Sequence, residues 1–105
     1  MSQFSIHQNL NPVSKGLYPY FINVQSSLLD ALDTRLVIPL SLKSRFDEKP
    51  IKTLNPIVTI GEDDFMVLTQ QMAAIHLKNL GQKIFDGLEK RQEILSAIDL
   101  LITGF

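Results

Sequence analysis

Apolar residues alternate with polar ones along the first two thirds of this chain, and they recur every three to four residues near its end. A period of two is typical of β-strands, and a period near 3.6 is typical of an amphipathic helix. The pattern therefore predicts a mainly β chain with strands over 3–77 and a C-terminal helix over 87–102. A length of 105 residues fits one domain with one modest core.

The clearest strand signal is a hairpin over 56–69. Two β-rich runs, 56–60 and 65–69, flank four turn-forming residues. The run 35–40 is almost continuously apolar, which predicts a central strand that is covered on both faces until Pro39 ends its pairing. The other expected strands are 3–7, 18–25 and 72–77.

Two segments between the strands are expected to be irregular. Residues 26–34 combine leucines with two aspartates and predict a loop. Residues 41–55 form a mildly basic excursion, which is either a solvated loop or an accessory hairpin.

The helix has a start signal and a stop signal. Asp86 is a candidate N-cap with Glu89 three residues later, and Gly104 suits a left-handed helix end. Four residues at helical spacing form the apolar stripe: Ile94, Ala97, Ile98 and Leu101.

Composition narrows the possible functions. Ten Lys and Arg against eleven Asp and Glu give a net charge of −1, so no basic field favours direct binding to nucleic acid. Without any cysteine the chain has neither disulfides nor a thiolate metal site. No apolar run approaches the length of a membrane span, so we expect a soluble, cytoplasmic protein without membrane contact.

Catalytic motifs are missing from the sequence. The only histidines, His7 and His76, lie far apart, and no glycine-rich phosphate loop is present. The acidic turn at Glu62, Asp63 and Asp64 is a weak metal candidate, because turns are commonly acidic. We therefore expect a binding protein and not an enzyme, with no metal and no cofactor.

The last helical turn suggests a partner. Leu100, Leu101 and Ile102 are consecutive apolar residues, so their side chains must point in more than one direction around the helix. One direction is the core, and the other is most economically a second copy of the chain. A helix that is fully buried in a monomer is the alternative.

Four segments together resemble the CcdB family of toxin–antitoxin toxins. They are 24–30 (VQSSLLD), 35–40 (RLVIPL), the hairpin over 56–69, and 97–105 (AIDLLITGF), in this order over nearly the whole chain. The resemblance implies an SH3-like antiparallel barrel, as in the MazF and Kid toxins, with a minor sheet from 41–55 and a long C-terminal helix. It also implies a homodimer that binds the GyrA subunit of DNA gyrase and traps the enzyme with its DNA cleaved. A CcdA-like antitoxin would neutralise the toxin, and their complex would repress its own operon, with the antitoxin contacting the operator DNA.

The resemblance also assigns residues to two surfaces. The gyrase-facing set is Leu28, Leu29, Asp99, Ile102, Thr103, Gly104 and Phe105. The alternative is that Leu28, Leu29 and Ile102 only fill the core. The antitoxin is expected near the loop 8–18 and the excursion 41–55, where its acidic segment would pair with Lys43, Arg45, Lys49 and Lys52.

The sequence departs from the family pattern at two positions. Thr103 stands where the type member has tryptophan, the residue best suited to a binding hot spot, and Phe105 could restore aromatic area. His76 stands where relatives tend to carry proline.

Two other functions stay open. A MazF-like endoribonuclease would use Arg35, Thr69 and His76 at the phosphate, because a shared fold does not dictate function. The other possibility is a dimeric relative that has lost its toxicity.

Overall fold

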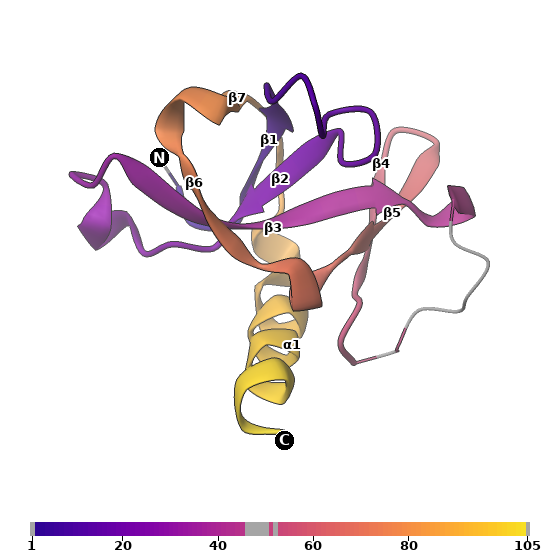
Figure 1. Ribbon diagram of the computed structural model, residues 1–105. Coiled ribbons are helices and arrows are strands. Elements are labelled where there is room, and N and C mark those ends of the chain that lie inside the picture. Colours follow the sequence, from indigo (N-terminus) through magenta and orange to yellow (C-terminus); the bar gives the residue numbers. More distant parts are fainter. Residues whose placement is uncertain (1, 46–50, 52, 105) are drawn as a thin grey trace.

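A computed structural model of the protein describes residues 2–45, 51 and 53–104. Within these residues, one antiparallel sheet curls into a partly closed barrel, and a C-terminal helix projects from it (Figure 1). The strands are β1 (Ser5–Asn9), β2 (Tyr20–Asn23), β3 (Thr34–Leu42), β4 (Ile57–Ile60), β5 (Asp63–Val67), β6 (Ala73–His76) and β7 (Leu80–Asp86). The helix α1 is Arg91–Thr103. The predicted class, mainly β with a C-terminal helix, is confirmed.

The central strand is β3, as the sequence predicts. It pairs with β2 along one edge, and along the other with β6 near its start and with β5 near its end. The expectation that Pro39 ends the pairing is wrong, because the strand continues to Leu42. Proline lacks the N–H but keeps its carbonyl, and the Pro39 carbonyl accepts a hydrogen bond from the Leu68 amide at 3.0 Å.

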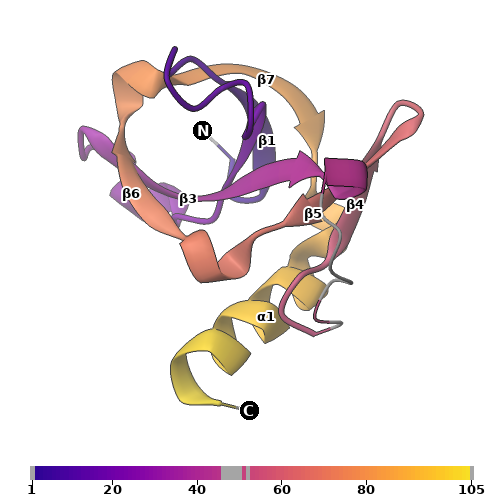
Figure 2. The same ribbon diagram turned by 45° about the vertical axis from the view of Figure 1, so that its right-hand side comes forward.

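The core lies inside the curl of the sheet, where Figure 2 shows β1, β3, β6 and β7 around a common interior. Its buried residues come from five strands, from the helix and from two positions that flank β1 and β2. They are Phe4, Ile6, Ile22, Val24, Ile38, Leu40, Val58, Phe65, Val67 and Ile94. Both faces of β1 are covered, because Ser5 and His7 are buried as well as Ile6.

The strands extend beyond the predicted limit of residue 77, because β7 pairs with β1. The register of this pairing shifts twice, between Ile6 and His7 and again between His7 and Asn9. A bulge inserts an extra residue and breaks the alternation of faces. This break explains why 80–86 carries no clean period of two.

The helix begins later than predicted. Asp86 is not the N-cap of a helix, because Gly87 takes that position before the 3-10 helix η5 (Leu88–Lys90) and Lys90 takes it before α1. The Asp86 Oδ1 nevertheless accepts a hydrogen bond from the Leu88 amide at 3.0 Å. Gly87 precedes this turn and donates to the Phe4 carbonyl at 2.9 Å. A Cβ at Gly87 would lie 2.7 Å from that same oxygen, so only glycine allows this close approach of the two chain segments.

The excursion 41–55 contributes no separate sheet among its described residues. After β3 ends, these residues form the 3-10 helix η2 (Lys43–Arg45) and a turn before Pro56. The accessory strands implied by the resemblance are therefore not seen there. The hairpin that projects from the barrel is instead β4–β5, one segment later (Figure 1).

The helix is anchored at its amino-terminal half. Ile94 and Ala97 are fully buried, whereas Leu101 and Ile102 are exposed. Among the described residues, no helix has both the length and the apolar character that a membrane crossing needs.

The anchoring predicts a large loss of stability on replacement of Ile94 by alanine. Deleting a fully buried isoleucine side chain costs about 2–5 kcal/mol, because buried contacts are lost and a cavity remains. We expect Ile94→Ala to lower the free energy of unfolding by this amount in urea titrations. Ile102→Ala is the matched control and should change it by less than about 0.5 kcal/mol, because Ile102 is 69% exposed. Equal losses for the two variants would contradict the anchoring.

Candidate functional site

The segment 26–34, between β2 and β3, presents leucines to solvent; we call it the leucine loop. It contains the 3-10 helix η1 (Ser27–Leu29). Leu28 is 91% exposed, and about half of the surface of Leu29 and of Leu32 is exposed. Leu28 therefore does not fill the core of this subunit. Three exposed leucines in nine residues are typical of a surface that a partner covers.

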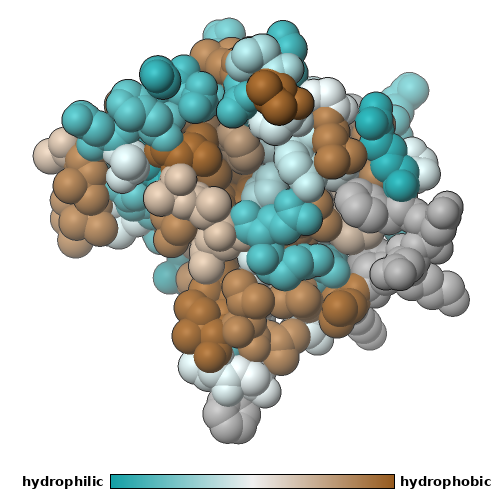
Figure 3. All heavy atoms as spheres, in the orientation of Figure 1, coloured by the Kyte–Doolittle hydropathy of each residue, from teal (hydrophilic) through white to brown (hydrophobic). Residues whose placement is uncertain are grey.

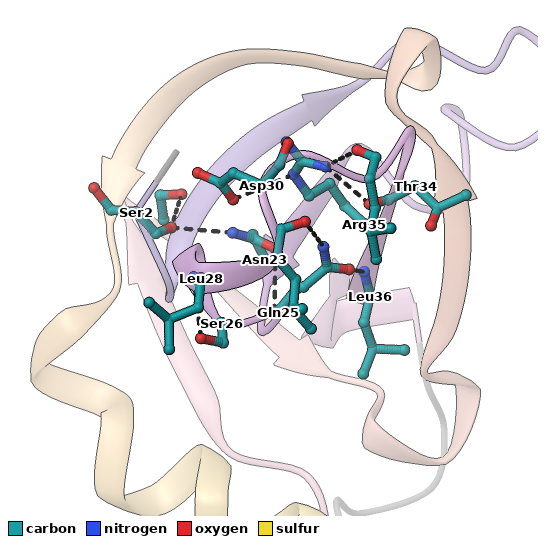
Figure 4. Close-up of polar contacts among 12 residues, drawn as sticks. Ser2, Asn23, Gln25, Ser26, Leu28, Asp30, Thr34, Arg35 and Leu36 are labelled. Atoms are coloured by element: carbon teal, nitrogen blue, oxygen red, sulfur yellow. Dashed lines mark hydrogen bonds and ion pairs between the residues drawn. The ribbon is translucent and has the colours of Figure 1, made fainter.

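Polar groups hold the leucine loop from beneath (Figure 4). The Ser26 hydroxyl accepts from the Leu28 amide at 3.2 Å and caps η1. Gln25 is buried; its amide nitrogen donates to the Leu29 carbonyl at 3.1 Å, and its oxygen accepts from the Leu36 amide at 2.9 Å. The Leu28 side chain points away from these contacts in Figure 4.

The second feature is the carboxyl end of α1, which we call the helix tip: Asp99, Ile102, Thr103 and Gly104. All four residues are exposed. Gly104 adopts the predicted left-handed conformation, with φ 80°, and its amide donates to the Leu100 carbonyl at 3.0 Å. The Thr103 hydroxyl donates to the Asp99 carbonyl at 2.7 Å. Phe105, which belongs to the predicted gyrase-facing set, lies outside the described residues.

One subunit does not bring these two features together. Figures 1 and 2 both show the leucine loop beside the barrel, and the helix tip at the far end of α1. Figure 3 shows apolar atoms gathered over the helix below the barrel. The predicted gyrase-facing residues thus fall into two exposed, partly apolar groups.

The predicted antitoxin-facing residues are described only in part. Lys43 and Arg45 are exposed on η2, whereas Lys49 and Lys52 lie outside the described residues. The Ser41 hydroxyl donates to the Leu17 carbonyl at 2.6 Å, which ties the loop after β1 to the end of β3. The two segments that the sequence analysis assigns to the antitoxin are therefore neighbours.

The residues of the endoribonuclease alternative do not form an accessible group. Thr69 is fully buried, and Arg35 is 4% exposed with its guanidinium bound to backbone carbonyls. His76 is exposed, and its Nδ1 accepts from the Lys78 amide at 3.1 Å. Within the described part of the chain, no cluster of three His, Asp or Glu side chains could hold a metal ion.

His7 is a structural residue in this fold. Burial lowers the pKa of His7 below its ordinary value of 6.5, and the nearby positive charge of Lys83 lowers the pKa further. The neutral ring places Nδ1 2.9 Å from the Gly81 carbonyl and Nε2 2.8 Å from the Ser5 hydroxyl. Because a carbonyl oxygen only accepts, Nδ1 carries the hydrogen, and the ring links β1 to β7.

Sequence reasoning missed two parts of this site. Leu32 was not assigned to any surface, although it lies three residues after Leu29 in the same loop. Arg35 was considered only as a phosphate ligand or strand residue. The sequence did offer one signal for a structural role: Arg35 begins an apolar run that is expected to be buried. An arginine in such a place must find hydrogen-bond acceptors within the fold.

A comparison with protein families places nearly the whole chain within one family model. The family model described as CcdB protein matches residues 3–104 of the 105-residue chain. The matched region includes each of the strands that the structure describes, the leucine loop and all of α1.

Proposed function

Because this chain belongs to the CcdB family of toxin–antitoxin toxins, we propose that it binds the GyrA subunit of DNA gyrase and traps the enzyme with its DNA cleaved. The observation that carries this proposal is the exposure of Leu28 and Ile102, at 91% and 69%. Large apolar side chains kept in solvent by a rigid scaffold favour recognition of another protein. The protein acts in the cytoplasm as a binding protein, without a catalytic residue, metal or cofactor of its own.

The active form is a homodimer. Leu101 exposes apolar surface on α1, and η3 (Thr69–Gln71) packs against this helix and leads into β6. On the sheet, Leu36 of β3 pairs with Ala74 of β6, and both are exposed. Pairing two copies over this surface would bury apolar area, and a two-fold axis would duplicate each leucine loop and helix tip. A symmetric gyrase then receives the same contact twice, which raises the overall affinity.

A CcdA-like antitoxin binds the surface formed by the loop after β1 and by η2. A cavity of about 510 Å³ lies in this region, lined by Gln8, Asn9, Leu10, Lys15, Gly16, Pro19 and Tyr20. Lys15 lines this cavity, and Lys43 and Arg45 are exposed on η2, where Lys43 also shares a pocket with Glu62, Asp63 and Asp64. The three cations would pair with an acidic, disordered segment that folds on binding. The toxin–antitoxin complex represses its operon through the antitoxin, because a chain of net charge −1 offers no basic field for operator DNA.

Expression in a gyrase-sensitive bacterium tests the target. We expect growth arrest in cells with ordinary GyrA, and survival in cells with a CcdB-resistant GyrA allele. Because only GyrA differs between the two strains, the difference in surviving colonies reports the target itself. Arrest that is equal in both strains, together with cleavage of bulk RNA by the pure protein, would instead favour the endoribonuclease. An absence of arrest in both strains would identify a relative that has lost toxicity.

A further inference from the structure

The leucine loop is built with its polar groups inside and its apolar groups outside. Leu28, Leu29 and Leu32 are exposed, while the neighbouring side chains of Gln25 and Arg35 are buried. Apolar packing therefore contributes little to the conformation of this loop, because Leu28 lies in solvent and Leu29 and Leu32 are only half buried. The conformation must depend on the hydrogen bonds beneath it.

Arg35 makes three of these hydrogen bonds (Figure 4). Its Nη1 donates to the carbonyls of Leu32 at 2.6 Å and of Thr34 at 2.9 Å, and its Nη2 donates to the Asp30 carbonyl at 3.0 Å. Its Nε lies 3.7 Å from Asp30 Oδ1. One guanidinium thus fixes three backbone positions in the second half of the loop.

The planar guanidinium of arginine can bind three carbonyls at once, and the ammonium group of lysine could not replace it. A guanidinium presents five donors in a rigid plane, whereas an ammonium is a single point on a flexible stem. An ammonium at this position could reach one of the three carbonyls but could not hold all of them in a fixed relation. Gln25 adds a fourth fixed carbonyl, that of Leu29.

We propose that Arg35 is the positioning residue of the leucine loop: its guanidinium fixes the backbone so that Leu28, Leu29 and Leu32 reach the protein partner together. The identity of that partner rests on the proposed function, whereas the fixing of the loop does not. The three guanidinium hydrogen bonds of Arg35 end on carbonyls of the loop, so the role of this side chain concerns the loop. A preorganised loop binds more tightly, because less conformational entropy is lost on association.

Arg35→Lys tests the proposal with two measurements. Amide hydrogen exchange should become about tenfold faster at Leu29 and Leu32, whose amides are bonded within the loop at 3.0 and 3.1 Å. Exchange at the barrel amides of Ile22 and Ile38 should stay unchanged. Affinity for purified GyrA should fall by about tenfold. Arg91→Lys, on the exposed first turn of α1, is the matched control and should change neither quantity.

A second variant tests the other polar side chain beneath the loop. Gln25→Met removes the bond to the Leu29 carbonyl and the acceptor of the Leu36 amide, so exchange should rise at the same loop amides and at Leu36, and stay unchanged at Ile22 and Ile38. Unchanged loop exchange in Arg35→Lys would overturn the proposal, as would a variant whose barrel amides exchange as fast as its loop amides. If the wild-type protein fails to bind GyrA while Arg35→Lys still loosens only the loop, the proposed target is wrong and the positioning role stands.

Discussion

Replacing Leu28 by aspartate is expected to weaken binding to GyrA by about 100-fold and to leave the stability of the barrel unchanged. Leu28 is 91% exposed in the free subunit, so a carboxylate at this position meets water and not the core. In the complex, the same carboxylate would be buried without a partner. An apolar anchor that is lost and replaced by an unpaired charge costs about 3 kcal/mol, which is the 100-fold change in affinity.

Val13→Asp is the matched control for this prediction. Val13 is 93% exposed and lies in the loop between β1 and β2, outside the predicted gyrase-facing set. The same change of an equally exposed apolar residue should leave GyrA affinity unaltered in titration calorimetry. If both variants bind as tightly as the wild type, the leucine loop is not part of the gyrase surface.

Deleting residues 103–105 is expected to abolish gyrase poisoning, with a fall in potency of about 100-fold or more. Thr103 and Gly104 are exposed, and their described bonds close the last turn of α1 through the Asp99 and Leu100 carbonyls. No buried side chain is lost with these two residues. Folding and antitoxin binding should therefore persist, with a loss in the free energy of unfolding of about 0.5 kcal/mol or less.

Urea unfolding and antitoxin titration separate the two possible roles of this tail. A truncated chain that unfolds at the wild-type urea concentration and binds antitoxin normally has lost only a recognition surface. A truncated chain that loses stability and antitoxin binding together would show that the tail is structural.

The fold was largely predictable because most of it is periodic. The hairpin β4–β5, the central β3 and the stripe through Ile94 and Ala97 follow from local spacing alone. β7 was not predicted because its pairing with β1 is bulged, and a bulge destroys the alternation on which strand prediction depends. The end of β3 was misplaced because Pro39 keeps a useful acceptor, the carbonyl that binds the Leu68 amide.

The site was less predictable because exposure is a property of the folded chain. A leucine pair such as Leu28 and Leu29 has the same local pattern whether it fills a core or faces a partner. Only the structure shows which of these holds, because the leucines lie outside and Gln25 and Arg35 lie beneath them. The role of Arg35 depends on carbonyls whose positions are set by the turn geometry of the loop, and no spacing rule encodes that geometry.

Gyrase recognition by the helix tip is tested most directly by the amount of linear DNA that gyrase releases when it is trapped with its DNA cleaved. Supercoiled plasmid, gyrase and ATP are incubated with the full chain or with the chain that ends at Ile102. The amount of linear DNA is then measured after the protein has been digested. If the helix tip recognises gyrase, linear DNA accumulates with the full chain and stays at background with the shortened one. Equal amounts with both chains, or background with both, would contradict the claim that the carboxyl end of α1 recognises gyrase.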